Sequence, residues 1–89
     1  MSLRDLFNER RWRTQDLAAL TVVIRHRGAP GDERRIAGAD ILAIEGGGLT
    51  VVAVDSEGQP VDDGRAFIPW HRVLRVVAPE AVLYVKEER

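Results

Sequence analysis

Two histidine–arginine pairs, far apart in the chain, hold the side chains best suited to chemistry on a phosphate. An imidazole can donate or accept a proton near neutral pH, and a guanidinium can bind two phosphate oxygens through parallel hydrogen bonds. If folding brings the pairs together, they form a phosphate site. The candidate phosphate-binding and RNA-binding residues are His26, Arg27, Gly28, Trp70, His71 and Arg72.

Both pairs need a bend in the backbone. Adjacent residues of a regular strand face opposite sides, so the two members of a pair reach one ligand only where the strand is interrupted. Pro69 fixes φ and ends the strand before the second pair, and Gly28 allows a turn after the first. Gly28 and Gly31 also leave backbone amides open to an anion.

Three functions remain open from these residues. The first is a non-catalytic RNA-binding module, in which the arginines hold phosphate oxygens, the histidines donate hydrogen bonds to a terminal phosphate, and Trp70 stacks a base. The second is a phosphodiesterase that opens a cyclic phosphate with His26 and His71 as acid and base. The third is a small barrel that binds proteins through exposed strand edges. A purely structural role for each pair, as a strand-end hydrogen bond or a surface ion pair, stands beside all three.

Composition excludes several other classes. The chain has 89 residues and no cysteine, so disulfides and thiolate metal sites are absent. No metal-spaced histidine–carboxylate motif, phosphate-binding glycine loop or serine–histidine–aspartate order occurs, and we expect no metal and no cofactor. No apolar run is long enough for a membrane span, and the first residues do not resemble a signal peptide. We therefore expect no membrane partner and a cytoplasmic location.

The net charge of −1 hides an uneven distribution. Residues 1–27 hold six arginines and three acids, and residues 65–89 hold four arginines and one lysine against three acids. Residues 28–64 hold two arginines and eight acids. If the two ends of the chain pack side by side, they form a basic face that attracts phosphate.

Hydrophobic periodicity predicts the elements that carry the pairs. Leu3, Leu6 and Phe7 mark one face of a helix over residues 3–11, and Trp12 is predicted to plug the helix end onto the core. Residues 20–27 alternate with period two, which places His26 at the end of an apolar strand face.

The remaining segments read as short strands and turns. We expect a strand over 34–37, a hairpin over 41–55 around three glycines, an exposed mobile loop over 56–64, a strand over 65–68, a single turn over 70–72, and strands over 73–77 and 81–86. The predicted fold class is α+β: one domain, residues 1–89, with an N-terminal helix packed on a small, strongly curved, mostly antiparallel sheet or partial barrel of about six short strands.

Three stretches resemble a known family, the RNA cyclic group end recognition domain of small archaeal and bacterial proteins. The first is an N-terminal helix that ends in a tryptophan, here Leu3-Arg4-Asp5-Leu6-Phe7 through Trp12. The others are His26-Arg27-Gly28-Ala29 with Asp32, and Ile68-Pro69-Trp70-His71-Arg72-Val73. Their order and approximate spacing agree over nearly the whole chain.

The resemblance implies recognition of RNA ends that carry a 2′,3′-cyclic phosphate. Carried over by position, it implies a site made of His26, Arg27, His71 and Arg72. It also implies RNA-processing proteins as further partners.

Overall fold

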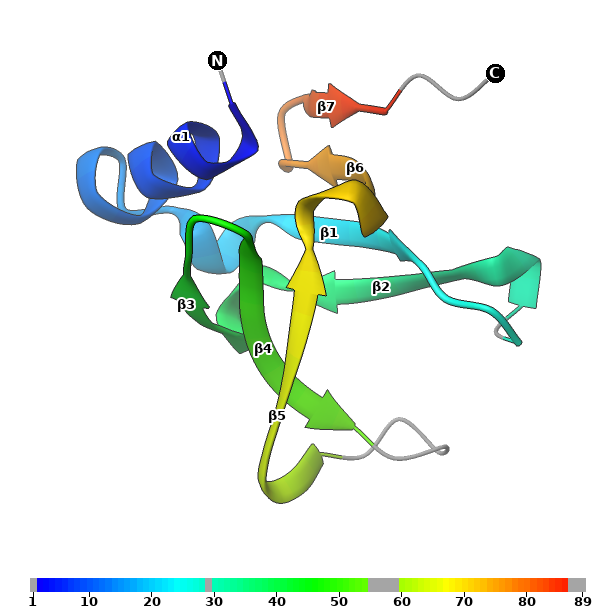
Figure 1. Ribbon diagram of the computed structural model, residues 1–89. Helices are drawn as coiled ribbons and strands as arrows, with labels where there is room; N and C mark the ends of the chain where they lie inside the picture. Colours follow the sequence, from blue (N-terminus) through cyan, green and yellow to red (C-terminus); the bar gives the residue numbers. More distant parts are fainter. Residues whose placement is uncertain (1, 29, 55–59, 87–89) are drawn as a thin grey trace.

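The computed structural model describes residues 2–28, 30–54 and 60–86. These residues form one N-terminal helix and two antiparallel sheets, which confirms the predicted α+β class (Figure 1). One sheet has the strand order β2-β1-β6-β7 and the other has the order β3-β4-β5. The sequence predicts a curved sheet or partial barrel of about six short strands, and the structure has four strands in one sheet and three in the other.

The N-terminal helix begins where its sequence predicts. Helix α1, Leu3–Asn8, is capped by Ser2, whose side chain accepts a hydrogen bond of 3.1 Å from the Asp5 amide. A π-helical turn, Glu9–Arg13, continues it. No helix in residues 2–28, 30–54 and 60–86 has the length and apolar character that crossing a membrane requires.

The prediction that Trp12 plugs the core is wrong. Its side chain is 70% exposed, and the Arg11 guanidinium lies 5.0 Å from the centre of its ring. The fully buried aromatic residue is Phe7. Trp12 belongs to the π-helical turn Glu9–Arg13, which buries none of its residues, so it does not continue the buried face of α1.

The first sheet contains the strands on which both histidine–arginine pairs depend. Its strands are β1 Thr21–Arg25, β2 Glu33–Ala37, β6 Val73–Val77 and β7 Val82–Val85. Strand β1 is central and pairs antiparallel with β2 and β6. Val22 and Ile24 are buried toward the core, as the alternation predicts.

The second sheet contains the predicted hairpin. Strands β3, Ile41–Ile44, and β4, Gly48–Val54, pair antiparallel, and β5, Pro60–Pro69, pairs with β4. The predicted loop over 56–64 lies partly outside the described residues. From Pro60 onward the loop prediction is wrong, because these residues belong to β5 and Pro60 is aligned with Val54.

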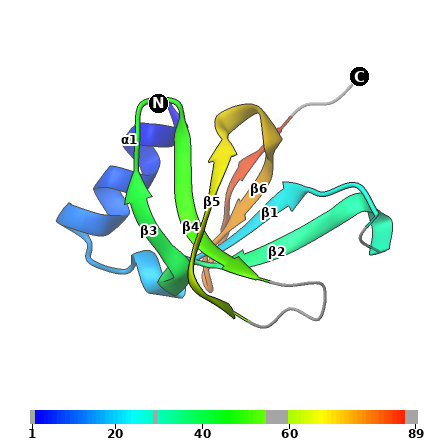
Figure 2. The same ribbon diagram turned by 60° about the horizontal axis from the view of Figure 1, so that its bottom comes forward.

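Two short 3₁₀ turns carry the chain from one sheet to the other. They are Gly38–Asp40, between β2 and β3, and Trp70–Arg72, between β5 and β6. In Figure 2 the labelled strands β3, β4 and β5 lie to the left of β6 and β1. The core residues come from α1, from both sheets and from the adjoining turns, and no pairing among the described strands closes a barrel. The core is Phe7, Leu20, Val22, Ile24, Ile36, Ile41, Leu49, Val51, Ile68, Val73, Val76 and Ala78.

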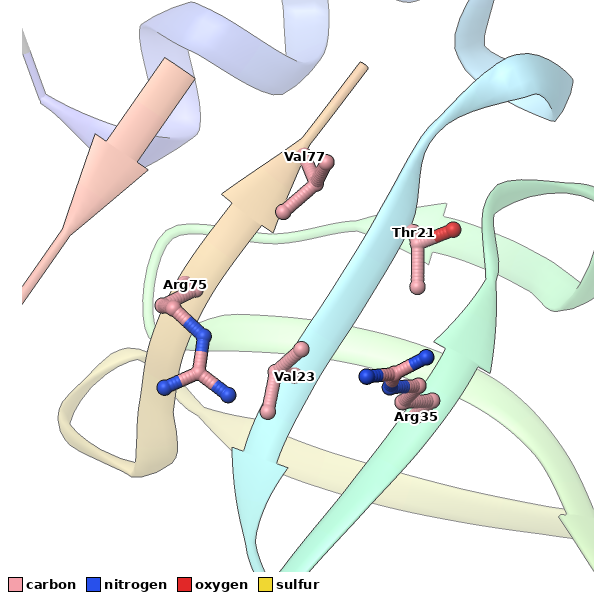
Figure 3. A pocket seen from close by; sticks show the side chains of 5 residues that line it. All are labelled: Thr21, Val23, Arg35, Arg75 and Val77. Atoms are coloured by element: carbon pink, nitrogen blue, oxygen red, sulfur yellow. The ribbon is translucent and has the colours of Figure 1, made fainter. Parts of the chain in front are cut away.

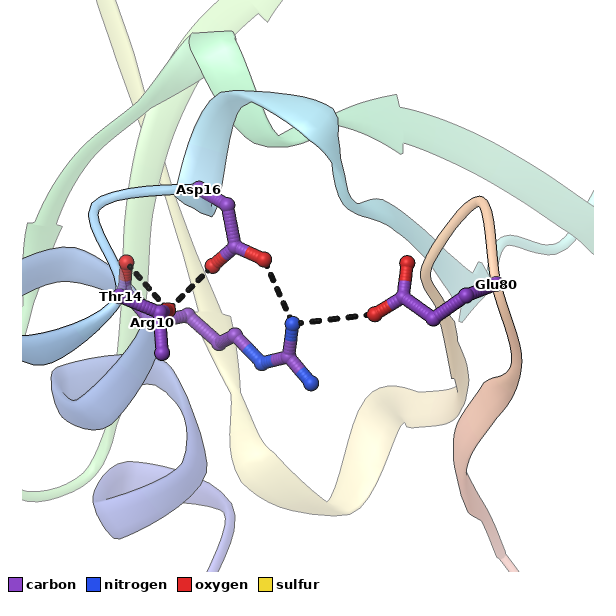
Figure 4. A network of polar contacts seen from close by, with 4 residues as sticks. All are labelled: Arg10, Thr14, Asp16 and Glu80. Atoms are coloured by element: carbon purple, nitrogen blue, oxygen red, sulfur yellow. Dashed lines mark hydrogen bonds and ion pairs between the residues drawn. The ribbon is translucent and has the colours of Figure 1, made fainter.

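A polar network ties the helical N-terminus to the first sheet (Figure 4). The Arg10 guanidinium donates to Asp16 at 2.6 Å and to Glu80, in the turn before β7, at 3.2 Å. The Thr14 hydroxyl also donates to the Asp16 carboxylate. This hydroxyl is the main reason that the pKa of Asp16 lies below its ordinary value, and Arg10 lowers it further against the opposing effect of partial burial.

We expect Asp16→Asn to reduce the dependence of folding stability on acid pH. Because the folded state lowers the Asp16 pKa, its stabilisation is present above the unfolded pKa and is lost as the pH falls below about 4. The wild type should therefore be more stable than Asp16→Asn at neutral pH, and the difference should narrow in acid. Urea unfolding between about pH 7 and about pH 3 measures this. Thr14→Val should also reduce the loss of stability in acid. If the free energy of unfolding changed with pH in the same way in wild type and in Asp16→Asn, the lowered pKa of Asp16 would be contradicted.

Candidate functional site

The two histidine–arginine pairs lie at the same end of the first sheet. Strands β1 and β6 are antiparallel, with Ile24 opposite Val73, so the residues that follow β1 lie beside those that precede β6 (Figure 1). A direct contact joins the two segments: Arg72 donates from Nε and Nη2 to the carbonyl oxygen of Arg25, at 3.2 and 2.9 Å. The fold therefore brings together two segments that are remote in sequence.

The charged side chains at this end remain accessible. Arg27 and His71 are exposed, and His26 and Arg72 are half-buried. A guanidinium has five N–H donors, and the contact with Arg25 uses donors on only two of the three Arg72 nitrogens. Arg72 is thus oriented by the backbone of β1 and still has donors for a ligand.

The loop after the first pair is closed by Asp32, which corrects one prediction. Gly28 has a φ of 91°, the left-handed conformation that glycine adopts without strain. Its amide is not open to an anion, because it donates to the Asp32 carboxylate at 3.4 Å. The Asp32 carbonyl also accepts from the His26 amide at 2.8 Å. In this structure Gly28 shapes the turn, and the nearby carboxylate takes the place that an anion would occupy.

Lys86 is a further cation at the end of the first sheet where the two histidine–arginine pairs lie, and it is not among the site residues predicted from the sequence. Its amide donates to the Leu74 carbonyl at 2.8 Å, which continues the alignment of β7 with β6. Its Nζ donates to the carbonyl oxygen of His71. The signal that could have found it is the alternation Tyr84-Val85-Lys86, which places Tyr84 and Lys86 on one face of a strand that must lie beside β6.

Trp70 is held rigidly in the turn between the two sheets. Its ring stacks on Phe7 with a centroid distance of 5.8 Å and an interplanar angle of 16°. Its indole N–H donates to the Gly46 carbonyl at 2.8 Å, and its amide donates to the Gly47 carbonyl at 3.2 Å. Trp70 is therefore a packing residue on one side and remains half-exposed on the other.

A depression lies on the outer face of the first sheet (Figure 3). Val23 is only 3% exposed there, although it points away from the core. Its neighbours on the adjacent strands are Arg35 and Arg75, and their aliphatic stems flank it. Arg75 is also paired with Glu33 at 2.6 Å. The depression is the space between the two arginine side chains, whose aliphatic parts shield Val23 from solvent. We assign no ligand to this depression.

Comparison of the chain with protein-family models, with curated proteins and with solved structures found no match. Within the described ranges, no group of three or more histidine, cysteine, aspartate or glutamate side chains is placed to hold a metal ion. The chemistry of the site therefore has to be inferred from the cations that the fold gathers around the end of β1 and the start of β6.

Proposed function

We propose that the protein binds RNA ends that carry a terminal phosphate, most specifically a 2′,3′-cyclic phosphate. The observation that supports this proposal is the double hydrogen bond from Arg72 to the Arg25 carbonyl. This contact joins the segment that follows β1 to the segment that precedes β6, and each segment carries one histidine–arginine pair. A terminal phosphate at this end of the first sheet meets donors from two segments of the chain.

The roles follow from exposure and donor geometry. Arg27 and Arg72 hold the non-bridging phosphate oxygens, because a guanidinium matches two oxygens with two parallel N–H groups. His26 and His71 donate the remaining hydrogen bonds. Lys86, held against the turn by the His71 carbonyl, adds a charge that strengthens binding without selecting the kind of end.

Asp32 sets a condition on this site. Its carboxylate lies against the Gly28 amide, where its negative charge repels an incoming anion. A phosphate that approaches from the Arg72 side avoids most of this repulsion, whereas a phosphate centred on Gly28 does not. Gly28 therefore contributes to the site through the shape of its turn.

The test is an amide-shift NMR titration with one short RNA in two forms, ending either in a 2′,3′-cyclic phosphate or in free hydroxyl groups. We expect saturable shifts in residues 25–28 and 70–73 that occur at lower concentration with the cyclic end. Residues 64–67 of β5, farther along that strand, provide an internal reference. Absence of shifts with either RNA, or equal affinities for the two forms, would contradict end recognition.

The same samples distinguish binding from turnover. Both imidazoles lie at one end of the sheet, so ring opening of the cyclic phosphate is a reaction that the site must be tested for. Conversion of the cyclic end to a monophosphate by wild type, and not by His26→Ala or His71→Ala, would reassign the protein as a phosphodiesterase. A cyclic end that stays intact during saturable binding fits the binding module.

A further inference from the structure

Trp70, which directly precedes the second histidine–arginine pair, lines a pocket together with a second aromatic residue, Tyr84. The pocket has a volume of about 440 Å³, within the ordinary range for small-ligand sites. It is built from four separate segments: the N-terminus, the turn between β3 and β4, the turn before β6, and β7. Its lining residues are Ser2, Leu3, Arg4, Gly46, Trp70 and Tyr84.

We infer that this pocket binds the terminal nucleobase of the RNA, an inference that rests on the proposed function. Trp70 supplies one aromatic wall, and Phe7 and Gly46 fix its position before any ligand arrives. A wall that is already ordered adds no cost of immobilisation to binding. Because Phe7 does not line the pocket, the pocket lies against indole surface that Phe7 leaves uncovered.

The chemistry of the lining fits a base better than an aliphatic ligand. Two aromatic side chains, Trp70 and Tyr84, offer π surfaces on which any base can stack. Arg4 is exposed, and its side chain forms no hydrogen bond or ion pair with any other residue that the structure describes. Its guanidinium is therefore available to donate to acceptor atoms on a base edge or to stack on the base.

Two residues of the pocket lie close in sequence to residues of the phosphate site. Trp70 directly precedes His71 in the turn, and Tyr84 in β7 lies two positions before Lys86, which follows the strand. Lys86 in turn contacts the His71 carbonyl. A nucleotide whose base enters between Trp70 and Tyr84 therefore has its sugar and phosphate directed toward the cationic end of the sheet. The protein would thus bind the last nucleotide by its base as well as by its phosphate.

The experiment compares a short hydroxyl-terminated RNA with the same RNA lacking the base of its last nucleotide. Loss of this base should weaken binding to wild type roughly tenfold. Tyr84→Leu should bind the complete RNA roughly tenfold more weakly than wild type does, and loss of the base should then have little further effect. Leucine preserves apolar volume on β7, and the change in the RNA needs no altered protein at all.

Phe67→Leu is the matched control, because Phe67 is a half-exposed aromatic residue on β5 that does not line the pocket. It should leave the effect of base removal unchanged. Equal affinity of wild type for the complete and the abasic RNA would overturn the pocket assignment. So would an effect of base removal that is the same in wild type and in Tyr84→Leu.

Failure of the pocket can be told apart from failure of the proposed function. If only the pocket assignment fails, the preference for a cyclic over a hydroxyl end persists in wild type. Adenosine, which has no phosphate, provides the converse check: it should shift the Trp70 indole N–H signal in wild type and not in Tyr84→Leu. No shift of that signal by adenosine would also count against the pocket.

Discussion

Gly48→Ala is expected to lower the free energy of unfolding by about 3 kcal/mol. A Cβ at this position would lie 2.1 Å from the Ile68 carbonyl oxygen and 2.9 Å from the Pro69 Cα. Both are backbone atoms of the neighbouring strand, so no side-chain rotation relieves the contact. Strands β4 and β5 would have to separate where Gly48 is opposite Pro69. Urea unfolding followed by far-UV circular dichroism measures the loss.

Two neighbouring glycines give matched controls for this variant. A Cβ on Gly46 meets no atom within 4 Å, and one on Gly47 makes an ordinary contact of 3.6 Å with the end of the Phe67 ring. Alanine at either position should change stability by less than about 1 kcal/mol. If Gly48→Ala were as stable as these two variants, the close packing of β4 on β5 would be wrong.

The effect of Gly48→Ala should extend to the candidate site. The carbonyls of Gly46 and Gly47 accept both N–H groups of Trp70, and Pro69 directly precedes Trp70. Displacement of the end of β5 therefore pulls the indole away from Phe7. In a Trp12→Phe background, where Trp70 is the remaining tryptophan, a fluorescence change that occurs before global unfolding would reveal this displacement.

Arg72→Ala is expected to weaken binding of the cyclic-phosphate RNA by at least tenfold, which is the largest effect on function that we predict. Hydrogen bonds to a charged group contribute about 1.5–3 kcal/mol, and Arg72 is also the residue that connects the two pairs. Removal of one phosphate contact should lower the slope of log affinity against log salt by about 1. Fluorescence anisotropy at several salt concentrations measures both quantities.

Two further variants make this result specific. Arg72→Lys keeps the charge but loses the planar fork, so it should restore the salt slope more fully than it restores the preference for a cyclic end. Arg65→Ala removes an exposed arginine from β5, four positions before Pro69, and should leave the preference unchanged. Unaltered affinity and salt dependence in Arg72→Ala would refute the assigned roles of both pairs.

The sequence predicts those parts of the fold that are determined by a few consecutive residues. Alternation predicts β1, three glycines predict the turn of the β3–β4 hairpin, and Pro69 predicts the end of β5. Each of these signals is complete within a few residues. The turn over 70–72 follows from the same proline and is confirmed as Trp70–Arg72.

The features that the sequence does not predict depend on distant partners. Residues 60–64 contain a proline, two acids and a glycine, which is typical of a loop, and they become a strand because β4 lies beside them. The division of the strands into two sheets likewise depends on the two 3₁₀ turns, Gly38–Asp40 and Trp70–Arg72, that carry the chain from one sheet to the other. For the candidate site, local patterns select the histidine–arginine pairs, but only the pairing of β1 with β6 brings them to one end.

The N-terminal residues form part of the proposed binding surface, and this affects how the protein should be handled. Ser2, Leu3 and Arg4 line the pocket, and Phe7 supports its tryptophan wall. A purification tag fused ahead of Ser2 would emerge beside the opening and compete with any ligand for it. An amino-terminal fusion is therefore not a neutral handle for this protein, and affinities measured before and after tag removal should differ.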